Sequence, residues 1–157
     1  MKVGKVFEIS YAHRIPNHPG ECKYLHGHNG KIEVEIEGSL NTDTSMLIDF
    51  GIIKDRVDRW LKDNLDHRTI LEENDEIDLN EETSRIVRLN AFPTAEALAV
   101  VILNEVVCSL VDKSYLEDWS HKVRFWETST SYAEVSCKDT YGDVHITYQK
   151  IKALEKV

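Results

Sequence analysis

Three histidines mark the junction between two strand-like segments of the sequence. His13 ends an alternating segment, and His26 and His28 begin the next one, with Gly27 between them. Residues at i and i+2 of a β-strand point to the same face, so His26 and His28 would project together. Three neutral imidazoles with an open fourth position are the usual protein ligands of a catalytic zinc ion. A single histidine of this kind is more often a hydrogen-bonded core residue, but the convergence of three predicts a metal site.

Cys22 lies four residues before His26, in a glycine-containing loop and next to Lys23. A nearby metal and a lysine lower the pKa of a thiol, which makes Cys22 a candidate for proton transfer, although a free cysteine is more often an inert buried residue. Cys108 and Cys137 fall at apolar positions of a helical and a strand segment, so both are expected to be structural. Three cysteines imply no disulfide framework.

Two carboxylates complete the set of chemically interesting residues. Asp66 precedes His67, and a carboxylate beside an imidazole sets its tautomer and raises its basicity, unless the pair merely ends a helix. Glu127 takes an inward position after Val123 and Phe125, where a carboxylate needs a partner unless it ends a strand at the surface. A ligand with paired N–H donors would suit it. The other three histidines are expected at the surface: His18, His121 and His145.

Hydrophobic periodicity indicates the elements that must position these residues. A period of two predicts strands over residues 3–13, 26–37, 123–127 with a continuation at 133–137, and 144–148. Helical spacing predicts one helix after Asp49, with an apolar stripe through residues 53–65, and a second opened by Pro93 and Thr94. The acid-rich segment 72–91 is expected to be a long surface loop. Strands adjacent in sequence favour an antiparallel α+β sheet with both helices on one face.

Length and charge exclude several classes of protein. The 157 residues suit a single domain spanning 1–157, with 72–91 as a surface insertion. A net charge of −9 argues against nucleic acid or an anionic membrane as the main partner. The N-terminus lacks the apolar core of a signal peptide, and no apolar run approaches the ~20 residues of a membrane span. We therefore expect a cytoplasmic protein with no membrane contact.

The order of these motifs resembles the 6-pyruvoyltetrahydropterin synthase family, most closely its bacterial 6-carboxytetrahydropterin synthase branch. The resemblance spans nearly the whole chain and rests on Ala12-His13-Arg14, Cys22-x3-His26-Gly27-His28, Ile48-Asp49-Phe50, Leu65-Asp66-His67, Pro93-Thr94-Ala95-Glu96 and Glu127-Thr128. The three-residue spacing between Cys22 and His26 is that of the carboxy branch. Gly30 departs from the family, where an aromatic is usual, as does Ser45, where a glycine is usual.

The resemblance implies an α+β T-fold, with a four-stranded antiparallel sheet and two helices on one face. Such subunits form trimers whose sheets join into a barrel, and two trimers stack as a homohexamer. Closure of the barrel would also pair the open edges of the sheet. An active site at the subunit boundary is implied, with Asp66 and His67 coming from a neighbour of the chain that holds zinc and Cys22.

The resemblance also implies a zinc-dependent lyase acting on 7,8-dihydroneopterin triphosphate in queuosine (7-deazaguanine) biosynthesis. Zn²⁺ on His13, His26 and His28 would bind the side-chain hydroxyls of the substrate. Cys22 would remove a proton, with His67 and Asp66 as the partnering acid–base pair. Glu127 would hold the pterin ring, and Thr94 and Ala95 would add contacts at the helix start. The products would be 6-carboxy-5,6,7,8-tetrahydropterin, acetaldehyde and triphosphate.

Alternatives remain open at this point. Glu21-x4-His26 resembles a family variant in which a glutamate replaces the cysteine and cleavage gives 6-hydroxymethyl-7,8-dihydropterin for folate, so the protein could have both activities. A surface glutamate is the competing interpretation of Glu21. A 6-pyruvoyltetrahydropterin synthase is a further possibility within the family. Outside it, three histidines also suit a zinc hydrolase, or a structural zinc oligomer if a fourth ligand closes the site.

Overall fold

A long antiparallel hairpin carries the predicted metal ligands. In the computed structural model, which describes residues 1–110, 119–138 and 144–147, strand β1 (Lys2–His13) pairs along its whole length with β2 (His26–Glu37). Alternate residues of each strand are buried, as the period of two predicts. The register places Tyr11 opposite His28 and His13 opposite His26, so all three predicted ligands lie at one end of the hairpin.

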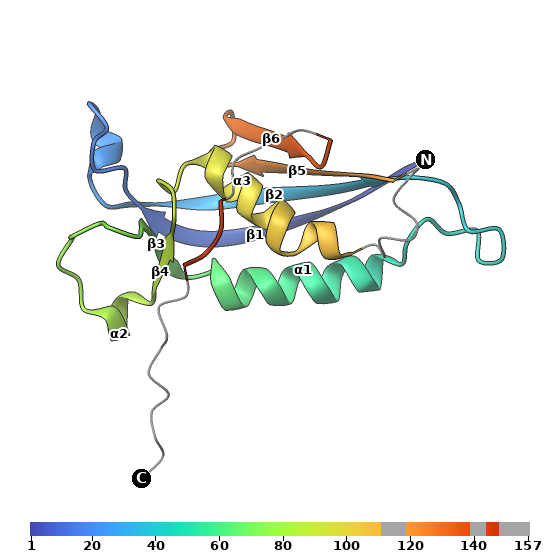
Figure 1. The fold of residues 1–157 in the computed structure, drawn as a ribbon, viewed down its shortest axis with the longest axis horizontal. Helices are drawn as coiled ribbons and strands as arrows, with labels where there is room; N and C mark the ends of the chain where they lie inside the picture. Colours follow the sequence, from blue (N-terminus) through green and yellow to red (C-terminus); the bar gives the residue numbers. More distant parts are fainter. Residues whose placement is uncertain (111–118, 139–143, 148–157) are drawn as a thin grey trace, which may run out of the picture.

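The hairpin forms the centre of a six-stranded sheet with the order β4-β3-β1-β2-β5-β6 (Figure 1). On one side, β2 pairs antiparallel with β5 (Ser120–Trp126), which pairs antiparallel with β6 (Tyr132–Ser136). On the other side, β1 pairs in parallel with β3 (Arg68–Glu72), which pairs in parallel with β4 (Ile86–Leu89). The predicted antiparallel pairing is confirmed for β1, β2, β5 and β6, and so is the α+β class. The predicted number of four strands was wrong, because β3 and β4 extend the sheet in parallel.

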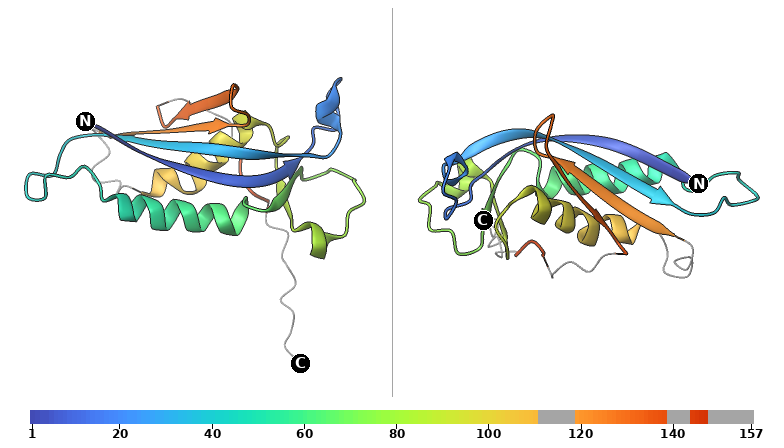
Figure 2. Two further views of the ribbon diagram at one scale, coloured as in Figure 1. Left: turned by 180° about the vertical axis from the view of Figure 1, so that it is seen from behind. Right: turned by 90° about the horizontal axis from the view of Figure 1, so that it is seen from above.

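Two helices cover one face of the sheet, as the two views of Figure 2 show. Helix α1 (Phe50–Asn64) begins at Asp49, whose carboxylate accepts the N–H of Gly51, and it buries Ile53, Val57 and Leu61. Helix α3 (Ala95–Glu105) begins at Thr94, whose hydroxyl accepts the N–H of Ala97. Both predicted N-caps are confirmed. The buried positions of the two helices and of the inner sheet face form one hydrophobic core. Among the described residues, no helix covers the opposite face of the sheet (Figure 2).

Segment 72–91 is more structured than a surface loop. It contains the end of β3, the short helix α2 (Glu81–Ser84) and β4. The side chain of Asp75 is fully buried, and its two carboxylate oxygens accept hydrogen bonds from Nε and Nη2 of Arg14, the residue after His13. The sequence did not indicate β4, because the strand is only four residues long and only one of them, Leu89, is buried.

The predicted strand 144–148 and the continuation at 133–137 also differ from expectation. Residues 132–136 return as β6 in a hairpin with β5, and Ile146 forms only an isolated antiparallel bridge with Leu89. Position 148 lies outside the described residues. A single bridge does not make a further strand, because a β-ladder needs several consecutive residue pairs.

The surface position expected of His121 was wrong, and so was the apolar placement expected of Cys108 and Cys137. His121 is 1% exposed, because the period of two that buries Val123 and Phe125 extends back to it. Cys108 lies in the short 3-10 helix η2 (Val107–Ser109), and it is exposed, as is Cys137 just beyond β6. His18 and His145 are half-buried.

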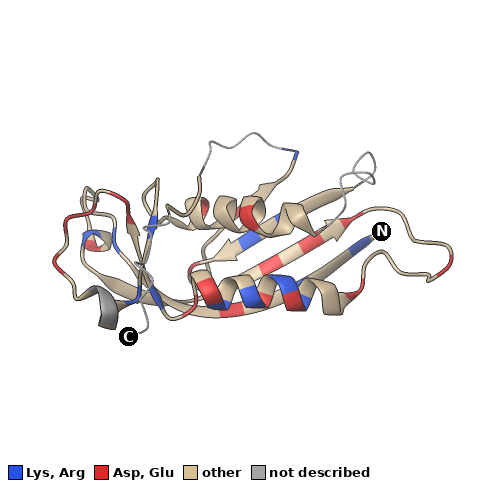
Figure 3. Ribbon diagram, turned by 60° about the horizontal axis from the view of Figure 1, so that its bottom comes forward, with Lys and Arg blue, Asp and Glu red and all other residues tan. Residues whose placement is uncertain are grey.

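Charged residues occupy the outer surfaces of these elements. Acidic and basic positions alternate along the outer side of α1 (Figure 3), including the pair Asp58 and Lys62. On the helix-free face of the sheet, Lys122 and Arg124 of β5 both pair with Glu134 of β6, and Arg124 also pairs with Glu33 of β2. No helix in the described part of the chain is long and apolar enough to cross a membrane.

Candidate metal centre

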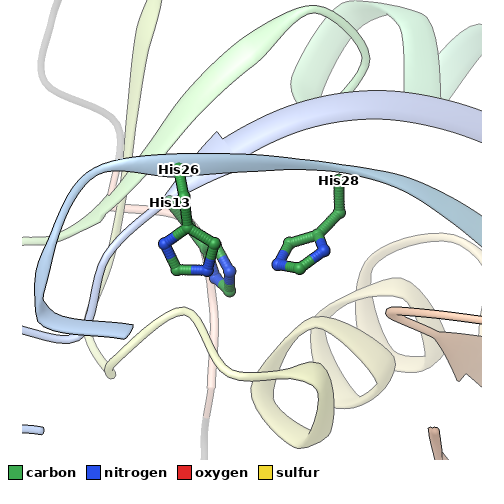
Figure 4. A group of neighbouring side chains, drawn as sticks. All are labelled: His13, His26 and His28. Atoms are coloured by element: carbon green, nitrogen blue, oxygen red, sulfur yellow. The ribbon is translucent and has the colours of Figure 1, made fainter. Parts of the chain in front are cut away.

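His13, His26 and His28 converge at the end of the β1–β2 hairpin (Figure 4). Their ring centroids lie 4.6 Å (His13–His26), 5.1 Å (His13–His28) and 4.9 Å (His26–His28) apart. One ring nitrogen from each lies within 4.8 Å of the others, which is the spacing of groups that could hold one metal ion. The rings project from the strands toward the start of α3 in Figure 4. The structure thus brings together the three residues that the sequence predicted.

Backbone carbonyls orient two of the rings. His13 Nδ1 lies 2.6 Å from the carbonyl oxygen of Pro93, and His26 Nδ1 lies 2.7 Å from that of Tyr24. A carbonyl oxygen only accepts hydrogen bonds, so Nδ1 carries the proton in both residues and Nε2 carries the lone pair. Such second contacts fix the tautomer and orientation of metal-binding histidines. The contact of the Pro93 carbonyl with His13 was not predicted, since the sequence showed only the place of Pro93 at the start of the helix.

The remaining ring nitrogens are prepared to accept a ligand. Burial lowers the pKa of His13 and of His28, which keeps both imidazoles neutral. In the described structure, the Nε2 atoms of both residues are buried and have no hydrogen-bond partner. A buried acceptor without a partner costs free energy, and a bound cation would remove that cost. Three converging imidazoles therefore fit a metal ion of the zinc type.

Glu127 faces this cluster from the residue after β5. Its Oε1 atom lies 3.5 Å from His13 Nε2 and 3.9 Å from His28 Nε2, and 29% of its side chain is exposed. The inward position predicted from Val123 and Phe125 is where the structure places it. A carboxylate at this distance offers hydrogen-bond acceptors to any ligand that binds beside the metal centre.

Tyr11 is a second neighbour that sequence reasoning did not single out. Its ring centroid lies 5.2 Å from that of His13 and 5.7 Å from that of His28. The side chain is only 4% exposed, and burial together with the nearby carboxylate of Glu127 raises the pKa of its hydroxyl. The hydroxyl therefore keeps its proton. Its place two residues before His13 on one strand face was the available signal.

Cys22 and Glu21 lie in the loop that joins the two ligand-bearing strands. Both belong to the 3-10 helix η1 (Glu21–Lys23), with Cys22 half-buried and Glu21 exposed. The carbonyl of Cys22 accepts the N–H of Ile15 at 2.8 Å, which folds the loop back toward the end of β1. Both residues therefore lie in the loop between the ligand-bearing strands, but in the described structure their side chains do not contact the three histidines.

Asp66 and His67 lie at the edge of β1, between α1 and β3. Asp66 Oδ1 accepts the backbone N–H of Ser10 at 2.9 Å and lies 3.0 Å from His67 Nδ1. Burial raises the pKa of Asp66, but its hydrogen bonds from Ser10 and His67 outweigh burial, so the pKa lies below its usual value. The side chain of His67 is 69% exposed. The pair is formed as predicted, but among the described residues its side chains contact each other and Ser10, not the histidine cluster of the same chain.

Thr94 and Ala95 adjoin the metal centre through Pro93. The hydroxyl of Thr94 is engaged as the N-cap of α3, and Ala95 is its first residue. Because the carbonyl of Pro93 holds His13, the start of α3 is fixed next to the histidine cluster. The start of a helix offers backbone N–H groups that have no partner within the helix, and these could bind a ligand.

Comparison with known proteins decides the family. The family model described as 6-pyruvoyl tetrahydropterin synthase matches residues 2–138. The chain belongs to this family. It is 32% identical to the 6-carboxy-5,6,7,8-tetrahydropterin synthase of Rickettsia bellii over 86% of this chain and 99% of that protein. It is also 32% identical to the protein of that name from Haemophilus influenzae, over 85% of this chain and 96% of the relative.

Solved structures of the family share the fold. The 6-pyruvoyl tetrahydropterin synthase of Plasmodium vivax superposes with a TM-score of 0.68 at 21% identity, covering 87% of this chain and 98% of that chain. The enzyme of Caenorhabditis elegans gives a TM-score of 0.64 at 21% identity, covering 86% and 94%. The α+β T-fold that the family resemblance implied is thereby confirmed, with six strands in place of four.

Proposed function

We propose that this protein is a 6-carboxy-5,6,7,8-tetrahydropterin synthase. It would convert 7,8-dihydroneopterin triphosphate and water to 6-carboxy-5,6,7,8-tetrahydropterin, acetaldehyde and triphosphate, a step toward queuosine. Two relatives with this name are each 32% identical to this protein, over 86% and 85% of the chain. The observation that carries the proposal is the convergence of three imidazoles beside Glu127. This reaction needs a site for a metal ion and a side chain that anchors the pterin ring.

The metal would be Zn²⁺ on His13, His26 and His28. When bound, zinc supplies a Lewis acid that polarises substrate hydroxyls and acidifies the neighbouring C–H bonds. His13 and His26 are held for this role by the carbonyls of Pro93 and Tyr24. Three protein ligands leave the fourth position open for substrate, as in other catalytic zinc sites.

Proton transfer would fall to Cys22 and to the pair of Asp66 and His67. Cys22 lies in the loop between the ligand strands, so its thiolate would remove a proton from the substrate side chain. The imidazole of His67 is largely exposed and Asp66 orients it through Nδ1, which leaves Nε2 to exchange a proton. Its exposure and its place away from the histidines of its own chain suit a role in the active site of a neighbouring subunit.

Glu127 would anchor the pterin ring. Its carboxylate would accept paired hydrogen bonds from the pterin amino group and the ring N–H, the geometry in which a carboxylate binds most strongly. Thr94 and Ala95 would contribute further contacts from the start of α3. The contact of Glu127 with His13 and His28 supports this assignment, because an anchored ring would place its side chain at the metal.

The assembly would be a homohexamer of two stacked trimers in the cytoplasm. Strand β6 ends the sheet on one side, and on the other side residues 145–147 bond only the last part of the outer edge of β4. Open stretches of strand edge require closure or cover. Joining three such sheets into a barrel would satisfy these edges. Size-exclusion chromatography with light scattering tests this assembly directly.

Glu21 extends the proposal to a second product. A carboxylate and a thiolate differ by about four pKa units when unperturbed, so they suit different substrate protons. Cys22 and Glu21 adjoin each other in η1 and would reach the same bound side chain. We therefore expect Cys22→Ala to abolish the carboxy product while retaining 6-hydroxymethyl-7,8-dihydropterin, and Glu21→Ala to do the reverse.

The decisive experiment incubates the purified zinc protein with 7,8-dihydroneopterin triphosphate and identifies the products by mass spectrometry. Formation of 6-carboxytetrahydropterin and acetaldehyde supports the proposal. If Cys22→Ala yields neither product while still binding zinc and substrate, Glu21 has no catalytic part. Formation of 6-pyruvoyltetrahydropterin would assign the protein to the other branch. Stoichiometric zinc without pterin turnover would favour a zinc hydrolase or a zinc-dependent structural oligomer instead.

A further inference from the structure

The ring of Tyr11 lies beside the candidate metal centre, and neither the fold nor the proposed mechanism assigns a role to its hydroxyl. Tyr11 shares the inner face of β1 with His13 and pairs across the hairpin with His28. Its side chain is 4% exposed, and its oxygen is buried without a hydrogen-bond partner in the described residues. A buried tyrosine hydroxyl normally has a partner.

Gly30 gives the Tyr11 ring its position. A Cβ atom at Gly30 would lie 3.1 Å from Tyr11 Cε1 and 3.0 Å from Phe125 Cζ, so a larger residue would displace one of these rings. The rings of Tyr11 and Phe125 meet edge to face, with centroids 5.7 Å apart. Packing against Gly30, Phe125 and the two histidines therefore fixes the tyrosine ring beside the metal centre.

Two further buried atoms in the same cluster of rings lack partners in the described structure, namely His13 Nε2 and His28 Nε2. A metal ion would bind the lone pairs of the two nitrogens. A cation cannot accept a hydrogen bond, so the proton of the hydroxyl would still lack a partner. An oxygen atom bound to that metal would accept such a proton. A single ligand, an ion carrying an oxygen donor, would thus satisfy all three atoms.

We propose that the hydroxyl of Tyr11 donates a hydrogen bond to the ligand oxygen held at the metal, and so helps to select substrates with a hydroxylated side chain. This inference rests on the proposed function, in which that oxygen belongs to the substrate side chain. Tyr11 would act there as a binding and specificity residue, with no proton transferred.

The test compares two unreactive pterins on the zinc-loaded protein by calorimetry. Neopterin has a trihydroxypropyl side chain, whereas 6-methylpterin has the same ring without hydroxyls. Tyr11→Phe keeps the ring and removes only the hydroxyl, so it should weaken neopterin binding about tenfold and leave 6-methylpterin binding unchanged. Tyr132→Phe, at a tyrosine that is 51% exposed, is the matched control and should change neither.

A second measurement separates this role from a structural one. Because the hydroxyl has no partner within the described protein, Tyr11→Phe should leave the Tm of the metal-free, ligand-free protein unchanged or raise it. Equal neopterin affinities in wild type and variant would overturn the proposal, and so would an equal loss for both pterins or a lowered Tm. If the wild-type protein binds neither pterin, the proposed function itself fails and this inference fails with it.

Discussion

His13 and His121 are the two histidines that the described part of the chain buries, each with 1% of its surface exposed. Burial lowers the pKa of both, and neither Nε2 atom has a hydrogen-bond partner among the described residues. Their surroundings differ. The ring of His13 is held by the carbonyl of Pro93 and lies next to two imidazoles and Glu127. The neighbours of His121 on its strand face are apolar, beginning with Val123.

This difference shows that burial and a missing partner do not by themselves mark a functional histidine. Both properties follow wherever the period of two of a strand places an imidazole on the core face. What distinguishes His13 is convergence, since side chains from β1 and β2 place three ligand atoms within 4.8 Å. Within the described residues, His121 belongs to no such group.

The largest effect that this comparison predicts is on metal content. His26→Ala and His28→Ala should each lose bound zinc and nearly all turnover, because a site with three protein ligands has no spare donor. His121→Leu, the matched control, should retain about one zinc per chain as in the wild type. Elemental analysis of dialysed protein measures this. Stoichiometric zinc in either alanine variant would refute the ligand assignment.

Glu127 gives the next largest effect. Glu127→Gln keeps the shape but loses the charge and one acceptor, so the affinity for 6-methylpterin should fall at least about tenfold. Zinc content should stay at the wild-type level, because the three imidazoles remain. Glu134→Gln removes a carboxylate from the helix-free face of the sheet and should leave pterin affinity unchanged. An unaltered affinity in Glu127→Gln would make Glu127 a strand-end residue without a role in ligand binding.

The sequence predicted much of this because period and spacing are local properties. The two strands of the central hairpin, both N-caps and the pair His26 and His28 follow from residues within a few positions of one another. His13 joins that pair because the hairpin places the end of β1 opposite the start of β2. The position of Glu127 followed in the same way from the alternation of β5. The misassigned surface position of His121 came from stopping that alternation one pair too early, at Val123.

The parts that the sequence did not predict depend on contacts between distant segments. Strands β3 and β4 pair in parallel, and the short, mostly half-buried β4 carries little hydrophobic pattern of its own. The carbonyl of Pro93 meets His13 across 80 positions of the chain, and Asp75 meets Arg14 across 61. A backbone acceptor leaves no mark in residue type, so only the folded structure shows which ring it orients.

Asp75 offers a prediction of intermediate size. Its fully buried carboxylate binds Arg14, so Asp75→Asn should lower the free energy of unfolding by about 2–3 kcal/mol. Burial raises the pKa of Asp75, but Arg14, the N–H of Ile77 and Arg88 outweigh burial and leave the pKa below its ordinary value. This stabilisation is present above the ordinary pKa of 3.8 and is lost as the pH falls below it.

Urea unfolding of the wild type and Asp75→Asn at neutral and acid pH measures this difference, which should shrink as the pH falls. The zinc content of the folded variant should match the wild type, because Asp75 contacts no ligand atom in the described structure. Loss of zinc without loss of stability would mean that Arg14 positions His13 directly, and that convergence alone does not explain the metal centre.

The smallest effect concerns His121 itself. Burial lowers its pKa from the ordinary value of 6.5, so the unfolded chain binds a proton that the folded chain resists. Its contribution to stability is therefore complete above the ordinary pKa and declines as the pH falls below 6.5. His121→Leu removes this term, and the Tm of the metal-free variant should fall less than that of metal-free wild type between about pH 8 and about pH 5. His13 and His28 titrate in both proteins and so cancel in the comparison. If the Tm of both proteins falls equally with pH, His121 gains its proton in the folded state at little cost. His13 and His121 would then share their low exposure but not a lowered pKa.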